Sequence, residues 1–178
     1  APIPLHTHGR PEIPQPSVHR RCGAAVRRHP KLKQNQQFRA ALEREAAILA
    51  AKKCTPLDAA ELWMILDRLD SEEDEKTRGE LDRELHTKIA KIADNPMVYS
   101  VLAAADQLTD NIVSGTRDYI MRKNNSSKDI DEQHHRLVEA IINNDVEQAE
   151  HCMSEHMDTI ERYMDEMQKE RKPEGKRI

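Results

Sequence analysis

Residues 81–98 read LDRELHTKIAKIADNPMV, and this stretch decides the class of fold. Its apolar side chains recur every three or four positions, at Leu81, Leu85, Ile89 and Ile92. That spacing places them on one face of an α-helix. Asn95 then supplies a capping side chain and Pro96 suits the first position of a new helix. Two helices joined by so short a connection are typical of an antiparallel helical bundle.

The same periodicity continues on both sides of this stretch. It predicts helices over about 35–53, 56–70, 71–93, 96–121, 129–143 and 146–170. The expected fold is therefore all-α, an antiparallel bundle of six to seven helices spanning residues 35–172. Residues 1–34 are expected to form a proline-rich basic tail without regular structure, and residues 173–178 a polar tail.

Composition separates the two parts of the chain and excludes several classes of protein. Residues 1–34 hold seven Lys or Arg against one acid, and six of the nine prolines, whereas the remainder carries a net charge of −10. No run of about 18 apolar residues exists, so no membrane contact is expected. The three cysteines have no CxxC spacing and are expected to be free thiols in a reducing, cytoplasmic setting.

The positions of the histidines suggest a site within the bundle. Asp82 and His86 lie four residues apart on one helix face. His134 and His156 each fall on the apolar stripe of their own predicted helices, whereas His135 and His151 fall beside those stripes. Buried imidazoles are costly unless they are paired. A divalent metal would satisfy three histidines and one aspartate together, and this donor set suits Zn²⁺, Ni²⁺ or Fe²⁺ better than Ca²⁺ or Mg²⁺.

Other interpretations of these residues stay open at this point. Asp82 and His86 could form an ordinary surface pair, and each remaining histidine could be a core residue with one hydrogen bond. A carboxylate-bridged di-iron centre would need two Glu-x-x-His motifs, and Glu132–His135 supplies only one. No phosphate-binding loop, nucleophile elbow or HExxH motif is present. The chain is therefore not expected to be an enzyme.

Three segments, in order, resemble the effector-binding FCD domain of FadR-type regulators in the GntR family. Arg39–Glu43 with the alanines that follow is similar to the family's Arg-x-x-Leu-Glu opening. Asp82–His86 followed by Asn95–Pro96 is similar to Asp-x-x-Phe-His and Asn-Pro, with Leu85 in place of Phe. His134–Ile141 followed by Met153 and His156 is similar to the family's His-x-x-Ile-x-x-Ala-Ile and Met-x-x-His. The resemblance covers about residues 35–165.

The resemblance implies a role in transcription regulation. In many family members one Asp and three His bind a divalent metal, which here would be Asp82, His86, His134 and His156, with zinc or nickel as the expected metal. A small carboxylate effector, an organic or sugar acid, is expected to bind beside the metal, with Arg39 and Arg117 as candidate contacts. A homodimer is expected. The alternative is a helical scaffold or dimerisation module without a small ligand.

The resemblance also implies a DNA partner for the parent regulator. Family members contact DNA through a winged helix-turn-helix ahead of this domain, and residues 1–34 are too short and too rich in proline for one. The basic tail is expected to contact phosphates only without sequence specificity.

Overall fold

The computed structural model describes residues 32–122 and 126–171, and these residues form six α-helices. The helices are α2 (Leu32–Lys53), α3 (Pro56–Ser71), α4 (Glu75–Ile92), α5 (Pro96–Arg122), α6 (Ser126–Ile142) and α7 (Val146–Arg171). The predicted all-α class is confirmed. Of the two predicted tails, residues 1–31 and 173–178 lie outside the described residues, and residues 32–34 belong to α2.

Three helix starts differ from the sequence-based expectation. α2 begins at Leu32, three residues before its predicted start, and α6 begins at Ser126 instead of at about residue 129. α4 begins at Glu75 instead of at about residue 71, because Asp74 caps it by accepting from Thr77 N–H. In α6 the earlier start places Asp129 in the first helical turn. A carboxylate there is favoured by the positive end of the helix dipole.

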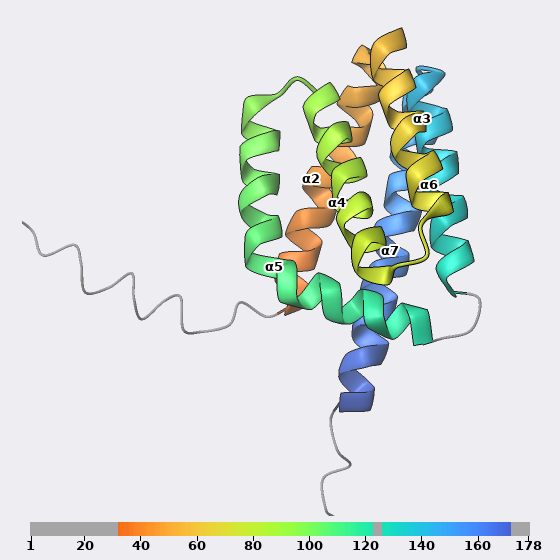
Figure 1. Cartoon of the computed structure of the whole chain (residues 1–178). Helices are drawn as coiled ribbons and strands as arrows, with labels where there is room; N and C mark the ends of the chain where they lie inside the picture. The colour runs from red at the N-terminus through yellow and green to blue at the C-terminus, as the bar shows by residue number, and fades with distance from the viewer. Residues whose placement is uncertain (1–31, 123–125, 172–178) are drawn as a thin grey trace, which may run out of the picture. The chain divides into compact units, whose positions relative to one another are not determined.

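The short connections are held by side-chain caps. Thr55 and Asp58 form a reciprocal capping box at the start of α3: Asp58 N–H donates to Thr55 Oγ1 at 3.2 Å, and Thr55 N–H donates to Asp58 Oδ2 at 3.2 Å. Asn95 Oδ1 accepts from the N–H groups of Met97 and Val98 at the start of α5. These caps fix where α3 and α5 begin, and each of these helices runs opposite to the helix before it (Figure 1).

α2 and α7 pack along each other, and α2 also contacts α4, α5 and α6. Four fully buried alanines on α2 allow this close approach: Ala46, Ala47, Ala50 and Ala51. Around them lies an apolar core that includes Leu85, Ile89, Leu137, Ile141 and Met153, all with no exposed surface. Each buried large side chain of this kind contributes about 1.5–3 kcal/mol.

Helix α5 bends, so that its two halves run in different directions and pack against different helices (Figure 1). The first half runs beside α2 and α4, and the second half crosses the end of the bundle toward α7 (Figure 1). A second, smaller apolar cluster forms beneath this crossing, from Tyr119, Ile120, Ile130, Tyr163 and Met167. The bend therefore closes one end of the bundle over the space between α4, α6 and α7.

None of the helices in the described part of the chain has both the length and the apolar character that a membrane span requires.

Candidate metal and ligand site

Three buried histidines from three helices meet inside the bundle. His86 of α4, His134 of α6 and His156 of α7 each place one ring nitrogen within 4.8 Å of the others. Their ring centroids are 4.7–5.8 Å apart, and each residue is at most 3% exposed. His134 and His156, which the sequence places on the apolar stripes of their helices, therefore do meet at one point. Three imidazole nitrogens this close could hold one metal ion.

Asp82 lies at the edge of this group, one helical turn before His86. Its Oδ1 is 3.2 Å from Nε2 of His134 and 3.4 Å from an Nη of Arg117. Burial, the largest influence, favours the neutral acid. The contact with His134 and the charge of Arg117 outweigh it, so the pKa of Asp82 lies well below its usual value. Asp82 therefore offers an ionised carboxylate beside the imidazoles.

Glu43 orients His86, and the sequence-based prediction missed it. Glu43 is 1% exposed, and its Oε2 accepts from Nδ1–H of His86 at 3.1 Å. Burial would raise the pKa of Glu43, but His86 and Arg39 lower it below its usual value. Burial would lower the pKa of His86, but Glu43 raises it. Because an ionised carboxylate only accepts, the bond assigns a proton to Nδ1, so Nε2 is the nitrogen with which His86 could bind a metal.

Gln133 holds His156 in the same way. Nε2 of Gln133 donates to Thr159 Oγ1 at 3.1 Å, so its Oε1 faces Nδ1 of His156 at 3.3 Å. Burial, followed by the charges of the neighbouring imidazoles, holds the pKa of His156 well below its usual value. The ring is neutral, and its Nε2 carries a lone pair. Partners that fix the tautomer in this way are typical of metal-binding histidines. In sequence, Gln133 could have been found only by its place one residue before His134.

His134 provides the test of whether a metal fits. It is 1% exposed, yet neither of its ring nitrogens makes a hydrogen bond. The approach of Nε2 to Asp82 lacks hydrogen-bond geometry. A buried polar atom left in this way costs about 1–3 kcal/mol. Nitrogen donors from three histidines with one carboxylate nearby suit a transition metal, so the residues present fit the ion that the resemblance implies.

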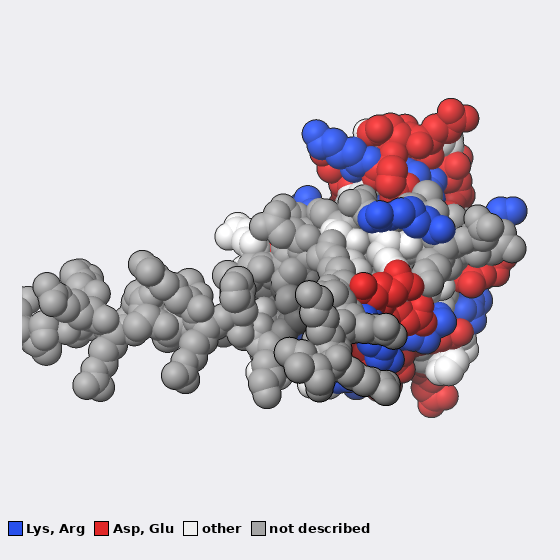
Figure 2. Space-filling model, turned by 90° about the horizontal axis from the view of Figure 1, so that it is seen from below, with Lys and Arg blue, Asp and Glu red and all other residues white. Residues whose placement is uncertain are grey.

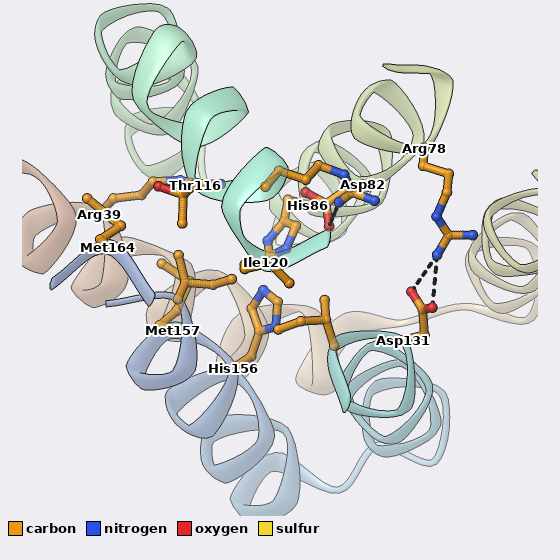
Figure 3. A pocket seen from close by; sticks show the side chains of 13 residues that line it. Arg39, Arg78, Asp82, His86, Thr116, Ile120, Asp131, His156, Met157 and Met164 are labelled. Carbon is orange, nitrogen blue, oxygen red and sulfur yellow. Dashed lines mark hydrogen bonds and ion pairs between the residues drawn. The ribbon is translucent and has the colours of Figure 1, made fainter. Parts of the chain in front are cut away.

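A cavity opens beside the histidines, and we call it the chamber. It is lined by Arg39, Arg78, Asp82, His86, Thr116, Arg117, Ile120, Ile130, Asp131, His156, Met157, Ile160 and Met164 (Figure 3). Its volume is about 50 Å³. One water needs about 10–15 Å³, so the chamber has room for a handful of non-hydrogen atoms.

The two arginines predicted to contact an effector both line the chamber, but each already has acidic partners. Arg39 places Nε 3.1 Å from Asp106 and an Nη 3.2 Å from Glu43. Arg117 donates from Nε to Glu75 at 2.5 Å and also approaches Asp82. Their charges are therefore largely compensated within the protein.

A third arginine, Arg78, was not predicted. It makes a bidentate pair with Asp131 at 2.8 and 2.9 Å and donates to Leu69 O at 2.5 Å, so it ties α4 to α6 and to the end of α3 (Figure 3). Such planar two-bond pairs fix geometry as well as charge.

The charged groups in and directly against the chamber are largely paired with one another. Three guanidinium groups face five carboxylates, those of Glu43, Glu75, Asp82, Asp106 and Asp131. Asp106 also lies in the field of Arg83, and Glu43 raises the pKa of His86. Most of the negative charge around the chamber is therefore balanced by cationic side chains.

The two alternative interpretations can now be compared with the geometry. Asp82 and His86 do not form a surface pair, because His86 is buried and bonded to Glu43. Glu132 is exposed, and His135 is half-exposed and pairs with Asp70 at 2.9 Å. Glu132 and His135, the two ends of the Glu-x-x-His motif, therefore do not contribute to the chamber.

Comparison with known protein families matches residues 36–159 to the FCD domain. The chain belongs to the FCD domain family. The resemblance inferred from the sequence is thereby confirmed, and with it a ligand-sensing regulatory domain of the GntR/FadR type. The FCD domain is a domain of transcription regulators and not of an enzyme family.

Solved structures include chains similar to this FCD domain, and one of them is E. coli McbR/YncC. That match has a TM-score of 0.62 and 23% sequence identity. It covers 78% of this chain and 66% of the McbR/YncC chain, so the present chain accounts for less than two thirds of that protein's length. A search of curated proteins finds no match. The structural match supports the FCD fold.

Proposed function

We propose that this FCD domain senses a small carboxylate through a divalent metal. His86, His134 and His156 would hold the ion with Nε2 or, for His134, either ring nitrogen, and Asp82 would supply an oxygen. The observation that carries this proposal is His134, which is buried with two ring nitrogens that make no hydrogen bond.

The donor set favours zinc or nickel among the common divalent ions. Three imidazoles and one carboxylate are borderline donors, whereas Ca²⁺ and Mg²⁺ require mostly oxygen. When bound, such an ion would act as a Lewis acid with open coordination positions that an anionic oxygen can fill. Other residues of the chain would orient the imidazoles, exclude water from the site and line the space in which the effector binds.

The paired arginines refine how the carboxylate would be held. Arg39 and Arg117 are already paired with carboxylates of the protein. While so paired, they would raise the electrostatic potential in the chamber but would not bind the effector carboxylate directly. The metal then becomes the main anchor of the effector, and removing the metal should remove the response to acids. Arg39 and Arg117 stay candidate contacts that rearrangement of their partners could release.

DNA and dimer contacts are proposals for the parent regulator. On the face shown in Figure 2, acidic and basic side chains lie close to one another among the described residues, with a large acidic group at the top of the view. We assign DNA binding to a winged helix-turn-helix of the parent, with effector binding changing the packing of a homodimer.

The test compares metal content and thermal stability in two variants. His134→Ala should lose the bound metal, whereas His151→Ala, which changes an exposed histidine on α7, should keep about one metal per chain. At a free metal concentration 100 times Kd, metal should stabilise wild type by about 2.7 kcal/mol, and the His134→Ala protein by none. Equal metal content in wild type and His134→Ala would refute the site. Wild-type protein that responds to organic acids after chelation would refute the metal's role.

A further inference from the structure

The walls of the chamber differ in chemistry from one side to the other. The side formed by α4 carries the imidazole of His86 and the carboxylate of Asp82. The other walls carry five apolar side chains: Ile120, Ile130, Met157, Ile160 and Met164. The polar residues that α5 and α6 place among them, Thr116, Arg117 and Asp131, already have partners within the protein. Figure 3 shows Ile120 and Met157 directed into the same space as His86 and His156. A ligand in this space has one end in a polar setting and the other against apolar side chains.

The polar groups that line the chamber already have partners within the protein. The three guanidinium groups are paired with carboxylates, and Thr116 also has a partner. Nε of Arg39 makes no hydrogen bond but lies 3.1 Å from Oδ1 of Asp106. A ligand hydroxyl buried against the apolar side chains would leave water without gaining a hydrogen bond, which weakens binding about tenfold or more. An aliphatic tail has no such cost and gains from burial against isoleucine and methionine.

The size of the chamber sets the length of the tail. A volume of about 50 Å³ holds a handful of non-hydrogen atoms. A six-carbon sugar acid exceeds that space and would bring several hydroxyl groups to the apolar walls. Both the volume of the chamber and its apolar side chains therefore favour a short aliphatic acid over a polyhydroxylated one.

We propose that the effector is a short aliphatic monocarboxylate of about two to four carbons, and not a sugar acid. This inference rests on the proposed function, because the carboxylate end is anchored at the metal site. The five apolar residues of α5, α6 and α7 then act as the specificity wall, and they select against hydroxyl groups at the tail.

The experiment uses acids that differ only at the tail. Binding of propionate and of 3-hydroxypropionate to zinc-loaded protein is measured by calorimetry, followed by butyrate, hexanoate and gluconate. Propionate should bind about tenfold or more tightly than 3-hydroxypropionate, and gluconate and hexanoate should bind more weakly than butyrate. Tighter or equal binding of 3-hydroxypropionate or gluconate would overturn the inference on polarity. Tightest binding of hexanoate would overturn the limit on length.

A variant tests the wall itself. Ile160 is only partly buried, so Ile160→Gln adds a donor and an acceptor with little threat to folding. It should narrow the ratio between propionate and 3-hydroxypropionate several-fold, whereas His151→Gln, on the exposed face of α7, should leave the ratio unchanged. An unchanged ratio in Ile160→Gln protein that still holds its metal would count against the wall. If the zinc-loaded protein binds none of these acids, the proposed function is refuted. If it binds them but prefers the hydroxylated acid, only the inference on the aliphatic tail is refuted.

Discussion

The bundle has two interiors, and the same helices build both. Toward one end, α2, α4, α6 and α7 meet in a dry core of alanine, leucine and isoleucine with no exposed surface. Toward the other end, α4, α6 and α7 enclose histidines, arginines and carboxylates around the chamber. His86 and Ile89 lie three residues apart on α4, so less than one helical turn separates the two chemistries. The dry core accounts for stability, whereas the chamber keeps buried groups that lower stability unless a ligand satisfies them.

The largest expected effect comes from the dry core. Leu137→Ala removes a side chain with no exposed surface and should lower the free energy of unfolding by about 2–5 kcal/mol, measured by urea denaturation. Leu57, which is 70% exposed on α3, is the control, because Leu57→Ala should change stability by less than about 0.5 kcal/mol. A loss below about 1 kcal/mol for Leu137→Ala would show that the core collapses around the gap and is not rigidly packed.

Substitution of a buried residue beside the chamber should raise the free energy of unfolding of the metal-free protein, whereas the substitution in the core lowers it. His134→Leu replaces an unbonded buried imidazole by an apolar side chain of similar size, so metal-free protein should gain about 1–3 kcal/mol. The measurement is urea denaturation of both proteins in the presence of a chelator, followed by the same titration with saturating zinc. Only wild type should then be stabilised. A metal-free variant less stable than wild type would show that His134 has a structural role. It would refute the claim that the buried groups at the chamber lower the stability of the metal-free protein.

A smaller effect is expected for the residue that orients His86. Glu43→Gln keeps the size of the side chain but removes the charge that fixes the proton on Nδ1. Metal affinity should fall about 10–100-fold, measured by competition with a chromophoric chelator. Glu45→Gln, an exposed change on the same helix, is the control. Nitrogen chemical shifts of His86 should show a changed tautomer population in Glu43→Gln, and an unchanged tautomer with unchanged affinity would refute the role of Glu43.

The smallest effect concerns a charge outside both interiors. Asp58 contacts Lys88 at 2.7 Å and caps α3, and its hydrogen bonds to Lys88 and Thr55 lower its pKa below the usual value. A carboxyl group whose pKa is lower in the folded than in the unfolded state stabilises the folded protein at any pH above its unfolded-state pKa, which is about 4 for Asp. This stabilisation is lost as the pH falls through the pKa of the folded state. Asp58→Asn should therefore cost about 1 kcal/mol at pH 7 and less at pH 2.

Thermal unfolding of Asp58→Asn and wild type at both pH values checks this, with Asp67→Asn, an exposed change on α3, as the control. Metal should bind to Asp58→Asn as to wild type, since Asp58 lies outside the chamber. A cost that stays the same at pH 2 would show that the cap, and not the charge, carries the effect.

Much of this protein follows from the order of its residues alone. The three- to four-residue recurrence of Leu81, Leu85 and Ile89 dictates a helix, because only a helical period places them on one face. The caps at Thr55 and Asn95 dictate where helices start, because their side-chain oxygens accept from backbone N–H groups only a few residues away. These are local interactions, and local spacing therefore predicts them.

The chamber was decided by tertiary packing. Sequence spacing placed His86, His134 and His156 on inward-facing stripes, but the crossing of α4, α6 and α7 determines that their nitrogens lie within 4.8 Å. Glu43 is 43 residues from His86, and Arg78 is 53 residues from Asp131, so no local pattern pairs them. The neutralised arginines and the apolar wall arise in the same way. A pairing across helices depends on how whole helices pack, and that depends on every side chain in the core at once.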